Sequence, residues 1–115
     1  MITAAYCSKE LCEMLTRKGI EARFSMKFEK GGAWYKRYTL DVASRWLREV
    51  HLIFFDFTLI LGDNVKHRFR IGVYQIKTDE EYADGVTYVW KKWVFGDSYE
   101  EVTEAAIRYC VEHLI

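Results

Sequence analysis

The spacing of apolar and polar residues along the chain predicts a regular series of helices and strands. Helical spacing of apolar residues occurs in residues 7–18, 39–50 and 98–115, and Ser8, Thr39 and Ser98 are suitable N-caps. Strands are predicted where residues alternate with period two or where Ile, Phe and Leu are dense. These strand segments are 23–29, 33–38, 51–61, 65–77 and 86–95. The predicted order is therefore α-β-β-α-β-β-β-α.

The last of these segments, SYEEVTEAAIRYCVEHLI, has the strongest helical signal. Ser98 followed by Glu101 has the spacing of a capping box, in which two otherwise unpaired amides at the helix start are satisfied. Apolar or small residues recur on one side of this segment, at positions 102, 106, 109, 110 and 114. The pattern predicts a helix that closes one side of a hydrophobic core.

Short connections between the strands determine the expected fold class. Gly31-Gly32 and the segment Gly62 to Asn64 are typical of tight turns, which join antiparallel strands. The chain is therefore expected to be α+β, with a mostly antiparallel five-stranded sheet and three helices chiefly on one face. The other face is expected to be wet. Strand 51–61, which is apolar on both faces, is expected at the centre, and Gly72 indicates a bulge or a closely packed neighbour. Residues expected to be well buried are Leu15, Met26, Leu47, Phe55, Ile71, Ala106 and Cys110.

The size and composition fit one domain covering residues 1–115. Half of the 115 residues are hydrophobic, which is enough for an ordinary core. The formal net charge is zero, which argues against binding duplex DNA through bulk charge. Residues 23–38, 65–76 and 86–95 carry formal charges of +4, +3 and +2, so the rest of the chain carries −9. The predicted strands are therefore basic, and the helices and loops are acidic.

The cysteines and the apolar runs bear on the cellular compartment. The 3 cysteines form an odd set without regular spacing, which favours reduced thiols over a disulfide framework. No secretory signal pattern begins the sequence. The longest apolar run, Leu52 to Leu61, is too short to span a bilayer and contains Asp56. A cytoplasmic protein that does not insert into membranes is expected.

Two blocks of the sequence, TLDVASRWLREVH (39–51) and SYEEVTEAAIRYCVEHLI (98–115), point to a family. Together with the N-terminal segment SKELCEMLTRKGI (8–20), they resemble small proteins of gut Bacteroidales and their phages or mobile elements. The resemblance implies an intracellular, dispensable protein that a phage or mobile element carries. That family has no assigned activity, so the resemblance implies no catalytic residues. The strand region between the blocks matches poorly.

The reactive residues of the chain form no catalytic or metal-binding pattern. Cys7, Cys12 and Cys110 stand in no local pattern with a histidine that would serve as a base. The histidines at 51, 67 and 113 lack the spacing of a metal motif. Asp56 is expected on the wet face, opposite Arg68 or Arg70, as an ordinary cross-strand pair. The sequence therefore predicts no enzymatic activity, no metal and no organic cofactor.

The remaining function classes depend on surface side chains. Aromatic residues suited to interfaces are Trp34, Tyr35, Tyr82, Trp90 and Trp93. They favour a non-catalytic interaction module that binds a protein partner, with formation of a homodimer as an alternative. A second alternative is binding of single-stranded nucleic acid on a basic and aromatic sheet face. The candidate residues for this face are Lys66, Arg68, Arg70 and Tyr74 on one strand, with Lys91 and Trp93 on the next.

Overall fold

A computed structural model gives the fold, and it describes residues 5–20, 26–30, 33–78 and 86–115. The described residues form three helices and five strands in the predicted order. The helices are α1 (Lys9–Arg17), α2 (Leu40–His51) and α3 (Tyr99–His113). The strands are β1 (Met26–Lys30), β2 (Ala33–Arg37), β3 (Ile53–Leu59), β4 (Phe69–Thr78) and β5 (Val86–Gly96). The α+β class is confirmed. The predicted turn at residues 31–32 lies outside the described residues.

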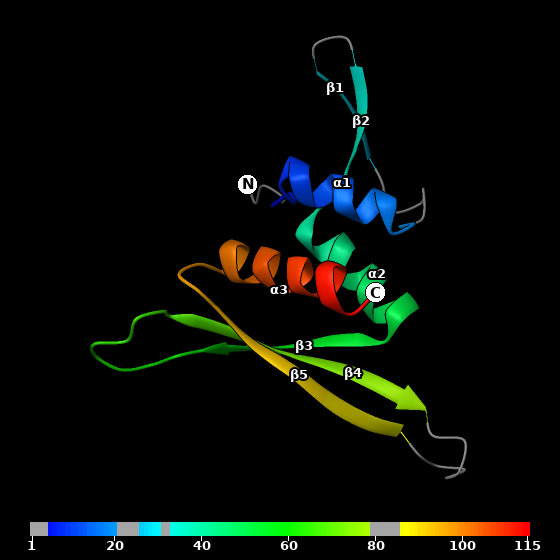
Figure 1. Ribbon diagram of the computed structural model, residues 1–115. Helices are drawn as coiled ribbons and strands as arrows, with labels where there is room; N and C mark the ends of the chain where they lie inside the picture. Colours follow the sequence, from blue (N-terminus) through cyan, green and yellow to red (C-terminus); the bar gives the residue numbers. More distant parts are fainter. Residues whose placement is uncertain (1–4, 21–25, 31–32, 79–85) are drawn as a thin grey trace.

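The predicted five-stranded sheet is wrong. Among the described residues, β3, β4 and β5 form a three-stranded antiparallel sheet, while β1 and β2 form a separate hairpin (Figure 1). The base of the hairpin is tied to the segment before α1, because Cys7 N donates to Tyr38 O at 2.9 Å and Leu40 N donates to Ala5 O at 3.0 Å. The helices lie between this hairpin and the sheet. The hairpin therefore cannot add its strands to the sheet.

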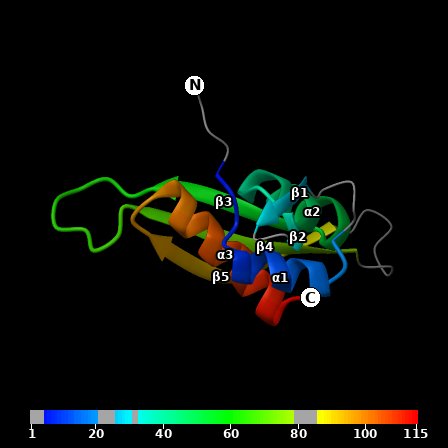
Figure 2. The ribbon, with the colours of Figure 1, turned by 90° about the horizontal axis from the view of Figure 1, so that it is seen from above.

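All three helices lie on one side of the sheet. The helices α2 and α3 cover one sheet face, α2 beside β3 and α3 above β4 and β5 (Figure 2). The helix α1 packs on the side of α3 that faces away from the sheet (Figure 1). Because no described helix lies beyond the opposite face of the sheet, that face is open to solvent.

The core lies between these layers. The most deeply buried side chains come from all three helices, from β3 and β4 and from Tyr38, and they include Leu11, Leu15, Trp46, Leu47, Ile53, Ile71, Val73, Ile107 and Cys110. Each large apolar side chain moved fully out of water contributes about 1.5–3 kcal/mol. Of the residues predicted to be buried, Leu15, Leu47, Ile71, Ala106 and Cys110 are at most 2% exposed. Phe55 is only partly buried against the core, and the side chain of Met26 lies outside the described residues.

The prediction that residues 51–61 form the central strand is also wrong. The centre is β4, and β3 lies at an edge, where Phe57 is 41% exposed and Leu59 is 46% exposed. Three consecutive strands joined as a meander place the second strand in the middle, whatever its composition. The apolar residues on both faces of β3 therefore do not require a central position, because Phe57 and Leu59 stay exposed on the helix-facing side and Phe54 lies on the open face.

The predicted helix caps are present. The side chains of Ser8, Thr39 and Ser98 accept hydrogen bonds from Leu11 N, Val42 N and Glu101 N, respectively. Helix α1 ends at a glycine with φ of +87°, Gly19, and Ile20 N donates back to Leu15 O. These local stops fix the lengths of the helices that carry the core.

Candidate functional site

The open face of the three-stranded sheet, here called the outer face, is the candidate site. Gly72 on β4 lies opposite Asp56 on β3 and Trp93 on β5. Because directly paired residues of antiparallel strands point to the same face, this register assigns the members of the face. The outer face includes Phe54, Asp56, Thr58, Arg70, Gly72, Tyr74, Ile76, Trp90, Trp93 and Phe95.

Aromatic rings dominate the outer face. Trp90 is 49% exposed and Phe95 is 47% exposed. The ring centroids of Trp90 and Trp93 lie 6.2 Å apart, with their planes inclined by 55°. The guanidinium carbon of Arg70 lies 4.3 Å from the ring of Trp93, which is within the range of a cation–π interaction. The outer face is therefore an apolar surface with a basic group held against its centre.

Gly72 allows this arrangement to form. A β-carbon at Gly72 would lie 2.9 Å from Cζ3 of Trp93 and 3.0 Å from Cε2 of Tyr74. The predicted close packing at Gly72 is therefore present. The irregularity in strand pairing lies nearby, on β5, where Val73 pairs with Lys92 but Tyr74 pairs with Trp90.

The predicted nucleic-acid residues are only partly brought together. Arg70, Tyr74 and Trp93 share the outer face. Lys66 and Arg68 precede β4 and do not, and Arg68 instead donates to Ile60 O at 3.1 Å within the connection from β3. The register skips Lys91, so alternation does not assign it to the outer face. Of the six candidates, three therefore form one patch.

Two aromatic residues of the outer face, Trp90 and Phe95, were not assigned to it from the sequence. Trp90 and Trp93 are separated by an odd number of positions, so simple alternation puts them on opposite faces. The bulge in β5 brings both to the same face. Phe95 lies two positions after Trp93, and Phe54 lies two positions before Asp56, so alternation places each with a residue that was predicted on this face. Alternation was therefore the signal that could have marked Phe95.

The pairing expected for Asp56 is wrong. Asp56 is on the outer face as predicted, but its direct neighbour on β4 is Gly72, and Arg70 lies opposite Thr58. The side chain of Asp56 is exposed. The outer face thus carries one acidic and one basic residue that are not cross-strand partners.

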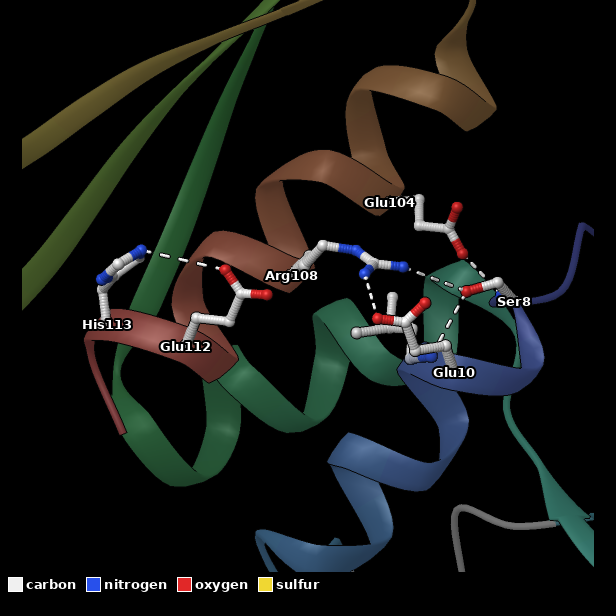
Figure 3. Close-up of polar contacts among 7 residues, drawn as sticks. Ser8, Glu10, Glu104, Arg108, Glu112 and His113 are labelled. Carbon is white, nitrogen blue, oxygen red and sulfur yellow. Dashed lines mark hydrogen bonds and ion pairs between the residues drawn. The ribbon is translucent and has the colours of Figure 1, made fainter.

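A second polar cluster joins the start of α1 to α3 (Figure 3). Glu104 accepts a hydrogen bond from the backbone N–H of Ser8, and Arg108 donates to Glu10 at 2.8 Å. The Ser8 hydroxyl accepts from Leu11 N, and Arg108 also donates to it at 3.4 Å. Because each of these groups is engaged in joining two helices, we assign this cluster a structural role.

The cysteine side chains are all buried. A hydrogen bond with Cys12, together with burial, raises the pKa of Cys7. Burial raises the pKa of Cys110 to about 12. A thiol in such surroundings behaves as a small hydrophobic group. Among the described residues, no group of three His, Cys, Asp or Glu side chains is arranged to hold a metal ion.

No helix formed by the described residues is long and apolar enough to cross a membrane. Comparison of the chain with protein-family models, with curated proteins and with solved structures found no match.

Proposed function

We propose that this protein is a small intracellular, non-catalytic interaction module that binds a protein partner through the outer face. The observation that carries the proposal is the cluster of Trp90, Trp93 and Phe95 on a sheet face that no described helix covers. Exposed patches of this kind mark interaction sites, and Trp, Tyr and Phe are enriched at the centres of protein interfaces.

The charges of the outer face favour a protein over a nucleic acid. Arg70 is the one basic residue that the strand register places there, and Asp56 balances it. Lys92 points toward the helices, where its Nζ lies 5.1 Å from the ring of Tyr109. Binding through a nearly neutral aromatic surface draws most of its free energy from burial against another apolar surface. Binding of nucleic acid draws most of its free energy from several basic contacts to phosphates.

The proposal is tested by affinity capture from cells that produce the protein, using matched variants. Trp90→Ala and Phe95→Ser are expected to reduce recovery of a specific partner about tenfold or more, as for interface hot spots. Leu61→Ser is the control, because Leu61 is 79% exposed and lies outside the strands of the sheet. The proposal is contradicted if the Leu61→Ser control also fails to recover the partner. It is contradicted equally if all variants recover the same amount of partner as the unchanged protein. Sedimentation at several concentrations identifies a second copy as the partner.

Single-stranded nucleic acid is a second candidate, favoured by the contact between Arg70 and Trp93. Bases stack on aromatic rings with about 1–3 kcal/mol per base, and an adjacent guanidinium adds a phosphate or stacking contact. Fluorescence anisotropy with oligo-dT and oligo-U at low salt tests this candidate. Arg70→Ala and Trp93→Ala are each expected to weaken binding without unfolding the domain. Absence of binding at tens of micromolar protein removes the candidate.

A further inference from the structure

Among the described residues, no strand pairs with the edge of β3 that faces away from β4. Ile60 N donates to Arg68 O at 2.7 Å, and Leu52 O accepts from Ile76 N at 2.9 Å, so these even-numbered residues direct their amide groups toward β4. Along an antiparallel strand the amide groups alternate in direction. Those of residues 53, 55, 57 and 59 therefore point to the free edge, where no strand of the described residues pairs with them.

A groove of about 320 Å³ lies along this edge. Its β3 wall includes Phe54 as well as Phe55 and Phe57. Ile53, Phe55, Phe57 and Ile71 line it from the helix-facing side of the sheet, and Phe54, which points to the other side, shows that the groove opens at the β3 edge. The other long wall is α2, which lies beside β3 (Figure 2). Ile71 of β4 and Tyr99 and Thr103 of α3 close its inner end, so the groove runs between the helices and the sheet and opens at the β3 edge.

The helix wall carries a charge at each end. Asp41, Ser44 and Arg48 line the groove and are spaced so that they share one side of α2. Asp41 and Arg48 are seven positions apart, which is about 10 Å along a helix axis. Asp41 lies at the end of the groove that is nearest Phe57. The Tyr99 hydroxyl donates to Asp41 at 3.4 Å, and the centroid of the Tyr99 ring lies 5.2 Å from that of Phe57.

The opposite end of the groove is basic. Helix α2 leads through Leu52 into β3, so Arg48, near the end of the helix, lies toward the first residues of β3. Ile53 lines the groove there. Along the direction of β3, the groove therefore runs from a basic end to an acidic end, with aromatic side chains between them.

We propose that this groove binds an extended peptide segment of a partner protein, which adds to β3 as an antiparallel strand. Main-chain pairing to the free edge supplies affinity, and the groove selects side chains. Antiparallel pairing is the more frequent and slightly more stable arrangement. It places the first residues of the peptide beside Asp41 and the last beside Arg48. The preferred segment therefore has a basic residue, an aromatic or aliphatic residue and an acidic residue, in that order, at every second position. Successive residues of the strand are about 3.3 Å apart.

This site shares only Phe54 with the outer face and contains none of Trp90, Trp93 and Phe95, which carry the proposed function, so its test is independent of that function. Two labelled synthetic peptides of identical composition serve as probes, Lys-Val-Phe-Val-Glu and Glu-Val-Phe-Val-Lys, each flanked by Gly-Ser. Fluorescence anisotropy is expected to show that the first binds the protein about tenfold more tightly than the second, because two attractive charge pairs become repulsive on reversal. Equal affinities, or no binding of either peptide, overturn the proposal.

Charge exchange on the protein gives the more decisive result. The double variant D41K/R48E is expected to reverse the preference between the two peptides, with circular dichroism confirming that it folds. Arg45→Ala is the control, because Arg45 pairs with Glu49 on the exposed surface of α2 and does not line the groove. It is expected to leave the preference unchanged. If the double variant keeps the original preference, the assignment of the groove is wrong.

Backbone NMR locates the bound peptide. The amide signals of Phe55, Phe57 and Leu59 are expected to shift and to gain protection from exchange when the first peptide binds. Shifts confined to Trp90 and Trp93 instead place the peptide on the outer face and overturn the proposal. Concentration-dependent protection of the β3 amides without peptide shows that a second copy occupies the edge, and it also overturns the proposal.

Discussion

The indole of Trp93 lies against the backbone of Gly72, where a β-carbon would be only 2.9 Å from Cζ3. An aromatic ring that covers a glycine on the neighbouring strand supplies the packing that the missing side chain cannot. This contact also holds Trp93 where Arg70 reaches it. The position of the indole, and with it the shape of the outer face, therefore depends on the absence of a side chain at residue 72.

Replacing Gly72 with alanine is expected to displace Trp93 and to destabilise the protein by about 1–3 kcal/mol, as overpacking does. Urea denaturation and tryptophan fluorescence measure the two effects. In the double variant G72A/W93A the obstructing ring is gone, so its destabilisation is expected to be smaller than the sum of the single effects. Strict additivity of the two substitutions would show that the contact does not constrain the strand.

Replacing Gly96 with alanine is expected to cost more than the change at Gly72. A β-carbon at Gly96 would lie 2.8 Å from Val102 N and 2.9 Å from Val102 Cβ. The obstructing atoms include the backbone of α3, which cannot rotate away as a ring does. We expect about 3 kcal/mol of destabilisation, at the upper end of the overpacking range. Urea denaturation of the two alanine variants in parallel gives the comparison, and a smaller effect at Gly96 would contradict it.

Removing the carboxylate of Glu104 is expected to loosen the contact between α1 and α3. This carboxylate accepts a hydrogen bond from Ser8 N at the start of α1 (Figure 3). Because it is a partly buried charged acceptor, Glu104→Ala is expected to cost about 1–2 kcal/mol. Glu13→Ala, at an exposed position of α1, is the control and is expected to stay within about 0.5 kcal/mol. Thermal denaturation of both variants checks the prediction.

The stability of the protein is expected to fall in the pH range below about 6.5 through His51. Burial lowers the pKa of His51, and the ring packs edge-on against Trp46 with centroids 4.7 Å apart. The unfolded chain, in which a histidine has a pKa of about 6.5, therefore binds a proton more readily than the folded protein. Protonation favours unfolding as the pH falls through this window.

The variant His51→Phe removes the titrating group and keeps an aromatic ring against Trp46. Denaturant unfolding at several pH values is expected to show a weaker loss of stability toward pH 5 than in the unchanged protein. Because carboxylates also titrate near the lower end of this range, the difference between the two pH profiles is the quantity that matters. Identical profiles would show that His51 does not contribute.

The features that the sequence predicts well are those that depend on near neighbours. Ser8, Thr39 and Ser98 cap helices because a cap requires only a hydroxyl and an amide three residues later. The pairing of strands depends on where distant segments settle. The bonds from Cys7 to Tyr38 and from Leu40 to Ala5, which hold the β1–β2 hairpin away from the sheet, leave no mark in the local alternation.

Only part of the candidate site could be predicted, because local alternation does not show where a strand starts or where it bulges. Alternation along one regular strand correctly put Arg70 and Tyr74 on one face. Lys66 and Arg68 were assigned to that face because the pattern continued beyond the actual start of β4 at Phe69. Trp90 joins Trp93 through a bulge, and a bulge changes the face of the residues around it without changing their composition. The groove beside β3 depends on the position of α2, which no periodicity encodes.

The contact between α1 and α3 has a consequence for synthesis of the protein. Roughly eighty residues separate the end of α1 from the start of α3. At about 5–20 residues per second, the ribosome needs roughly 4–16 s to make that stretch. During this time α1, whose Leu11 and Leu15 are fully buried in the finished fold, lacks its contact with α3. We expect a ribosome-bound chain halted before Tyr99 to be cleaved by protease within α1 and to recruit chaperones, and a chain extended past His113 to resist both.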